Sequence, residues 1–195
     1  PTAAGKTAVA WMVIAEMLRR SDGWALMIAP TAALVKQHLD DLESVFDKES
    51  TQPIAMSGAI PPSKREGMWN KGRLVISTPQ VVRNDVQNGV TRLDDVALLI
   101  VDEAHRATGN HAMAQVGDLF AEQQPGGLVI AATASPGHIE AEIHEVCERL
   151  QIVNIHARPS GDSLLEPYAT GLEVNDVVVE VPEELRLLAE PLKIW

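Results

Sequence analysis

The chain has 195 residues, 46% of them hydrophobic, and a formal net charge of −11 at pH 7. This length supports one substantial hydrophobic core and favours a single domain. The acidic charge argues against a protein that coats nucleic acid through a general basic surface, although it leaves room for local contacts. No apolar run approaches the roughly 18 residues of a membrane span, no leader with a cleavage site precedes the first motif, and Cys147 is the only cysteine. We therefore expect an intracellular protein, cytoplasmic or nucleoid-associated, without disulfides or a membrane partner.

The first motif is PTAAGKT (1–7), and apolar residues recur at helical spacing beyond it, which predicts a helix from about Lys6 to Arg20. A Gly-Lys-Thr at a helix start offers unpaired backbone N–H groups and a positive dipole end to a phosphate. The lysine adds a charge for the terminal phosphates, and the threonine hydroxyl is a ligand for Mg²⁺. Gly5, Lys6 and Thr7 are therefore a candidate nucleotide site. A phosphate loop normally connects a strand to its helix, so we expect a first strand to precede this loop in a longer parent protein.

Short apolar runs and helical patterns alternate at least five times along the chain. The predicted strands cover residues 24–29, 53–56, 73–77, 96–101, 128–132 and 152–156. Besides the first helix, we predict a helix ending near residue 46, a polar one around residues 64 and 65, and helices over 80–88, 112–122 and 138–150. Such alternation indicates an α/β fold with a doubly wound, mostly parallel sheet and helices on both faces. We also predict a strand over 172–181 and a new helix from residue 183.

The stretch VALLIVDEAHR (96–106) joins a short apolar run to two adjacent carboxylates. An unbroken run of this kind suits a strand that is covered on both faces of a parallel sheet. In open α/β sheets, ligands bind outside the carboxyl ends of the strands. Asp102 and Glu103 are thus placed where a metal ion and a phosphate could meet them. The alternative is that these two acids cap the following turn.

Five blocks of sequence stand in one order. They are PTAAGKT (1–7), APTAALVKQH (29–38), STPQVV (77–82), VDEAHRATGN (101–110) and TASPG (133–137). The set resembles the first motor domain of superfamily 2 helicases. Within that superfamily, DEAHRATGN followed by TASPG is most similar to the archaeal Hef and Fanconi anaemia M helicases, which remodel forked and branched DNA. The resemblance implies a RecA-like P-loop NTPase domain over residues 1–157, a connecting segment with a strand over 158–182, and the start of a helical region over 183–195.

The resemblance also implies ATP and Mg²⁺ as cofactors. The implied nucleotide-binding residues are Ala3, Ala4, Gly5, Lys6 and Thr7. Lys6 would grip the β and γ phosphates, and Thr7 would ligate Mg²⁺. Asp102 would hold Mg²⁺, mostly through water, and Glu103 would orient or deprotonate the attacking water. At Ala3 the family usually has glycine, because backbone comes close to the phosphates there.

Other blocks imply contacts beyond the nucleotide. His105, Thr133 and Ser135 would link the nucleotide state to nucleic acid and to a second RecA-like domain of the parent protein. That second domain would supply an arginine to the transferred phosphoryl group. The residues expected along one nucleic-acid strand are Thr31, Gln37 and Thr78.

Two alternatives stay open at this point. The first is a duplex-RNA-dependent ATPase, since RNA-sensing relatives share the same blocks. The second is a nucleotide- or DNA-binding module that does not hydrolyse ATP, either because this chain holds half of the catalytic site or because Ala3 weakens it.

The remaining polar and aromatic side chains favour structural interpretations. His38 falls on the apolar face of the second helix, and we interpret it as a surface or packing residue, together with His111, His138, His144 and His156. The tryptophans favour core packing over base stacking; they are Trp11, Trp24 and Trp69. A local basic run could meet a phosphate backbone or form a solvated face; it consists of Lys64, Arg65, Lys71 and Arg73.

Overall fold

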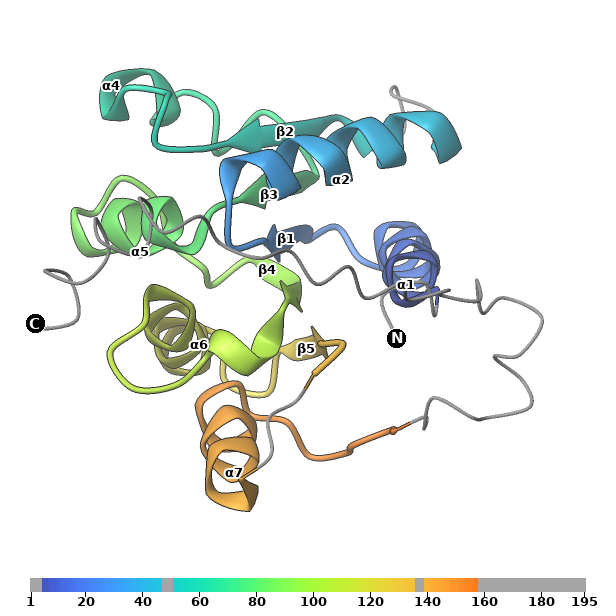
Figure 1. Ribbon diagram of the computed structural model, residues 1–195. Coiled ribbons are helices and arrows are strands. Elements are labelled where there is room, and N and C mark those ends of the chain that lie inside the picture. The colour runs from blue at the N-terminus through green and yellow to red at the C-terminus, as the bar shows by residue number, and fades with distance from the viewer. Residues whose placement is uncertain (1–4, 47–50, 136–138, 158–195) are drawn as a thin grey trace, which may run out of the picture.

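A computed structural model describes residues 5–46, 51–135 and 139–157 of the chain (Figure 1). Its helices are α1 (Lys6–Arg20), α2 (Ala32–Val45), α4 (Pro62–Arg65), α5 (Pro79–Gln87), α6 (Ala112–Gln123) and α7 (Glu140–Arg149), with a 3₁₀ helix η1 (Ala104–Arg106). Its strands are β1 (Trp24–Ile28), β2 (Pro53–Met56), β3 (Leu74–Ser77), β4 (Val96–Asp102) and β5 (Leu128–Ala132). Within these ranges, no helix is both long enough and apolar enough to cross a membrane.

The described strands form one parallel sheet in the order β2-β3-β1-β4-β5. Alternate residues of β1 point to opposite faces: Ala25 and Met27 pack with α1 and α2, whereas Leu26 and Ile28 pack with α5 and α6. Each face is thus covered by helices, which explains why the strands are continuous apolar runs rather than alternating ones. Five of the six strands predicted over the described residues and the doubly wound arrangement are confirmed.

Because all these strands are parallel, their carboxyl ends meet at one edge of the sheet. Ile28 pairs in register with Ser77 of β3 and with Val101 of β4, and Asp102 pairs with Ala132 of β5. The loops that follow these strands therefore start side by side. This edge carries most of the residues that the sequence singled out.

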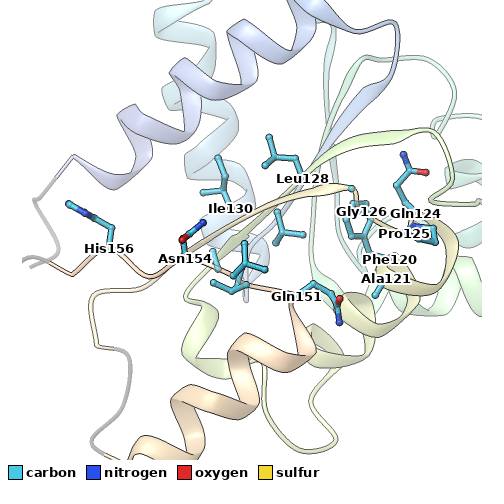
Figure 2. Close-up of a pocket in the computed structure, with 15 residues that line it drawn as sticks. Phe120, Ala121, Gln124, Pro125, Gly126, Leu128, Ile130, Gln151, Asn154 and His156 are labelled. Carbon is cyan, nitrogen blue, oxygen red and sulfur yellow. The ribbon is translucent and has the colours of Figure 1, made fainter.

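The predicted strand over residues 152–156 is wrong, since these residues form no strand in the structure. Between them and β5 lies a cavity of about 730 Å³. Figure 2 shows Leu128 and Ile130 of β5 on one side of this space, and Asn154 and His156 on the other. Neighbouring strands must lie about 4.8 Å apart to form a ladder, and the cavity keeps these two segments apart. An apolar pattern predicts an extended backbone but not the presence of a partner.

The basic run divides into two arginines that make internal contacts and two exposed lysines. Arg65 is 5% exposed, and its Nε donates to Oδ2 of the buried Asp85 at 2.7 Å. Arg73 is half-buried and donates to the carbonyl oxygens of Leu18 and Gly23. For these two arginines, both sequence interpretations were wrong, because their guanidinium groups serve internal contacts. The other two cations, Lys64 and Lys71, are exposed.

Trp11 and Trp69 are buried, which confirms core packing for both. Trp24 is partly buried and lies edge-on against Trp69, with ring centroids 6.1 Å apart. The predictions for Ala3, Ala4, His138 and residues 158–195 fall outside the described residues.

Candidate functional site

The start of α1 has the geometry of an anion site. Gly5 stands at the N-cap with φ 72°, a left-handed conformation that glycine adopts without a Cβ penalty. No acidic side chain occupies the first turn of α1, so no carboxylate of that turn offsets the positive end of the helix dipole. Lys6 and Thr7 open this helix and are partly exposed.

The Asp102 carboxylate lies at the end of β4 with its side chain 18% exposed. Its Oδ1 accepts from the backbone N–H of Glu103 at 3.0 Å, and its Oδ2 lies 2.9 Å from Nε2 of His38. Burial alone would raise the pKa of Asp102, but the hydrogen bond and charge of His38, the Glu103 N–H and the Lys6 charge together hold the pKa below its ordinary value. Asp102 is therefore ionised at neutral pH. The influence of Lys6 also means that the structure brings the first motif and the acidic motif together.

Glu103 has φ 52° and ψ 46°, a left-handed conformation that non-glycine residues rarely adopt. Such backbone strain persists where the surrounding structure imposes it, and it is often found at functional sites. The Glu103 side chain is 30% exposed, and its Oε2 lies 3.3 Å from Nδ1 of His105. It makes no capping hydrogen bond to η1, so the capping alternative for Glu103 is wrong. The contact of its carboxylate that the structure shows is the one with the His105 ring.

A hydrogen-bonded chain joins the ends of β4 and β5. Nδ1 of His105 lies 2.8 Å from Oγ1 of Thr133, and this hydroxyl donates to the Ser135 carbonyl at 3.2 Å. The Ser135 N–H donates back to the Thr133 hydroxyl at 3.2 Å. The three residues predicted to act together are thus in contact, and His105 connects them to Glu103.

The residues expected along a nucleic-acid strand differ in their exposure to solvent. Thr31 and Thr78 follow the neighbouring strands β1 and β3 at the carboxyl edge. Thr31 is exposed and caps α2 by accepting from the Leu34 N–H at 3.2 Å. Gln37 is exposed on α2, whereas Thr78 is only 7% exposed. Thr31 and Gln37 are thus accessible to a ligand, and the Thr78 side chain is turned into the protein.

The sequence interpretation missed the contact that His38 makes. The His38 residue is 5% exposed, and its imidazole contacts Asp102 and lies roughly perpendicular to Trp11, with ring centroids 6.0 Å apart. The signal was its place on the otherwise apolar face of α2, where a polar side chain requires a partner. Spacing along the chain could not identify that partner, which lies 64 positions away.

The donor set suits Mg²⁺. Among the described residues, no group of three or more His, Cys, Asp or Glu side chains could form a metal site. Mg²⁺ is usually held by one or two protein oxygens together with waters and substrate phosphates, rather than in an all-protein cage. The ionised Asp102 carboxylate and the Thr7 hydroxyl are hard oxygen ligands of this kind. None of the predicted site residues lines the cavity beside β5.

A parallel α/β domain with a Gly-Lys-Thr helix start and a strand-end acid pair on one edge is a P-loop nucleotide-binding domain. The chain belongs to the DEAD/DEAH box helicase family, whose sequence profile matches residues 1–143. The structure resembles the crystal structure of the Pyrococcus furiosus Hef helicase domain, with a TM-score of 0.81 and 34% identity, over 100% of this chain and 43% of that one. These matches confirm the family resemblance and the RecA-like fold.

Curated relatives extend the comparison. The chain is 38% identical, over 98% of its length, to a protein of Methanocaldococcus jannaschii named as an ATP-dependent RNA helicase, and covers 25% of that protein. It is 33% identical, over 95% of its length, to the Fanconi anemia group M protein of Gallus gallus, and covers 9% of it. It is 28% identical, over 95% of its length, to the ATP-dependent DNA helicase fml1 of Schizosaccharomyces pombe, and covers 22% of it. The chain thus spans a quarter or less of these relatives.

Proposed function

We propose that this chain is the ATP-binding part of an ATP-dependent DNA helicase or translocase that remodels forked or branched DNA. The observation that carries the proposal is the convergence of Lys6, the ionised Asp102 and the strained Glu103 at one sheet edge. The S. pombe relative named as an ATP-dependent DNA helicase supports DNA as the substrate class. The resemblance of the DEAHRATGN and TASPG blocks to fork-remodelling helicases supports forked DNA. Thr31 and Gln37 would contact one DNA strand from the same edge.

Each residue of the edge has a chemical task in ATP hydrolysis. The α1 N–H groups and Lys6 would hold the phosphates, and Thr7 and Asp102 would hold Mg²⁺. When bound, Mg²⁺ supplies positive charge that offsets the charge developing on the phosphate oxygens. Glu103 would orient the attacking water in line with the γ phosphorus and accept its proton. His105 lies beside Glu103 and contacts Thr133. Through these contacts a change in the bound nucleotide would be transmitted to Ser135.

The proposed catalytic site is complete only with a second RecA-like domain of the parent protein. Such a domain would place an arginine beside the transferred phosphoryl group. An arginine in this position typically raises the rate of phosphoryl transfer by a factor of about 10³ to 10⁵. In this arrangement residues 1–157 form the first motor domain, 158–182 a connecting segment and 183–195 the start of a helical region. The isolated chain would then bind ATP with little or no turnover.

Nucleotide binding by this chain is the first test. Binding of a fluorescent ATP analogue with Mg²⁺ should weaken about ten- to a hundredfold in Lys6→Ala, because a charged hydrogen bond to phosphate is lost. Lys64→Ala removes an exposed lysine on α4 and should bind like the unchanged chain. An equal, slight loss in both variants would contradict the proposal.

ATP hydrolysis is the second test, measured with and without forked DNA, on this chain and on a version extended through a second motor domain. Hydrolysis only in the extended form, stimulated by the fork, would support the half-site arrangement and the DNA substrate together. If neither form hydrolyses ATP, the chain is a binding-only module. Ala3→Gly is then the first change to make, since backbone approaches the phosphates at that position.

A second candidate function is a duplex-RNA-dependent ATPase, favoured by the name of the M. jannaschii relative. The extended form separates the two candidates. Stronger stimulation by an RNA duplex than by a DNA fork would favour the RNA substrate.

A further inference from the structure

His38 and Asp102 form a contact between a buried side chain and the candidate metal ligand. Nε2 of His38 on α2 lies 2.9 Å from Oδ2 of Asp102. An ionised carboxylate has only acceptor sites, so Nε2 carries the hydrogen and donates it. The other oxygen, Oδ1, accepts from the Glu103 N–H. Each carboxylate oxygen is therefore held by one donor, which fixes the rotation of the group while leaving lone pairs on its exposed side.

Packing alone does not account for this histidine. Within the described parts of the chain, its Nδ1 is buried and has no hydrogen-bond partner, which carries a desolvation cost. Its ring edge packs against Trp11, a contact that a leucine could make without that cost. What the imidazole provides, and an aliphatic side chain does not, is the hydrogen bond to Asp102.

The elements around His38 make its position rigid. Trp11 lies on α1, the helix that Lys6 opens, and it is 6% exposed. Asp102 ends β4, a central strand of the described sheet. His38 thus fills the junction of α1, α2 and β4, where its ring has little freedom to rotate.

We propose that His38 is a positioning residue for Asp102, holding the carboxylate in the orientation in which it binds Mg²⁺ together with a nucleotide. This role rests on the proposed function, since it requires a metal-bound nucleotide at Asp102. His38 does not contact the metal or the phosphates itself. It acts through the carboxylate, much as partners of metal ligands do in other sites.

Metal-dependent nucleotide binding tests the role directly. A fluorescent ATP analogue is titrated into the chain in excess Mg²⁺ and again in EDTA. The readout is the affinity in Mg²⁺ divided by the affinity in EDTA. His38→Leu should lower this ratio about 10- to 100-fold, the usual effect of losing a partner of a metal ligand. The affinity in EDTA should stay the same. His38→Gln should restore the ratio, because its Nε2 amide can donate to the same oxygen.

A matched control and a second measurement separate this role from folding. His144→Leu makes the same exchange at an exposed histidine of α7 and should leave the ratio unchanged. In the nucleotide-free chain, ¹⁵N NMR of the imidazole should find a hydrogen on Nε2 of His38, the nitrogen that faces Asp102. This measurement does not depend on any variant that fails to fold.

The outcomes are distinguishable. If the unchanged chain shows no metal-dependent binding, the proposed function fails. If it does bind and His38→Leu keeps the full ratio, the positioning role alone is overturned. A hydrogen on Nδ1 with Nε2 bare would also overturn it, since Asp102 would then have no donor from His38.

Discussion

Two contacts between a carboxylate and a basic side chain lie in different regions of this domain, and they differ in burial and in hydrogen bonding. Asp85 on α5 is 1% exposed, and its oxygens accept from Nε and Nη2 of Arg65 and from Nε1 of Trp69. Nη1 of Arg65 also donates to the Ile60 carbonyl. Asp102 is more exposed. Among the described residues, it accepts from two donors, and the histidine it contacts has one nitrogen without a partner.

This difference separates a structural ion pair from a ligand site. A pair that is buried and hydrogen-bonded on both sides leaves no access for a ligand, so Arg65 and Asp85 fix the segment around α4 onto α5. A carboxylate with unused lone pairs on its open side can take a metal or a water molecule. Exposure together with unused acceptor sites, rather than the presence of charge, marks the candidate metal-binding carboxylate.

The largest expected effect comes from breaking the satisfied pair. Arg65→Ala leaves the Asp85 charge buried without its cation and should lower the free energy of unfolding by about 3–5 kcal/mol. Urea denaturation measures it. The neighbouring Lys64→Ala is the matched control, since Lys64 is exposed, and it should change stability little. If both variants lost the same free energy of unfolding, the buried pair would contribute no more to stability than an exposed lysine does.

Sequence alone located the chemical residues at the sheet edge well. Parallel strands bring their carboxyl ends together, so any residue that follows a buried strand is placed by topology alone. Asp102 was found in this way, whereas Thr31 and Thr133 were proposed from the resemblance of their sequence blocks to superfamily 2 helicases. Gly5 was identified by its place in the Gly-Lys-Thr motif, and its left-handed conformation was learned from the structure.

Sequence patterns could not predict contacts between side chains that are far apart along the chain. Arg65 and Asp85 are 20 positions apart, and His38 and Asp102 are 64 apart. Periodicity predicts which face of a helix a side chain occupies, but not which side chain meets it. The strand predicted at 152–156 failed for a related reason, since a ladder requires a neighbour that the local pattern does not encode.

A smaller effect should come from relieving the strain at the candidate site. Glu103→Gly removes a Cβ from a left-handed residue and should raise the free energy of unfolding by about 1 kcal/mol relative to Glu103→Ala, which loses nearly the same side chain but keeps the Cβ. Urea denaturation of both variants gives the difference. If the alanine variant proves as stable as the glycine variant, the backbone at Glu103 is not strained.

The smallest effect tests a third side chain whose hydrogen bond is structural. Nδ1 of His111 accepts from the Met113 N–H at 3.2 Å and caps α6. Burial and the nearby Arg106 charge both lower the pKa of His111. Its contribution to stability is therefore fully present above the ordinary histidine pKa and is lost as pH falls through the lowered, folded-state pKa.

His111→Ala should cost about 0.5 kcal/mol at a pH of about 8, and the deficit should shrink towards a pH of about 5, where the unchanged chain loses the cap by protonation. Thermal unfolding at the two pH values measures both numbers. His111→Asn retains a capping oxygen that does not titrate, so it should match the unchanged chain at the higher pH and exceed it at the lower. A deficit that grows on acidification would mean that the imidazolium is the stabilising form, and His111 would then resemble Arg65, a cation held by its surroundings, rather than a neutral acceptor.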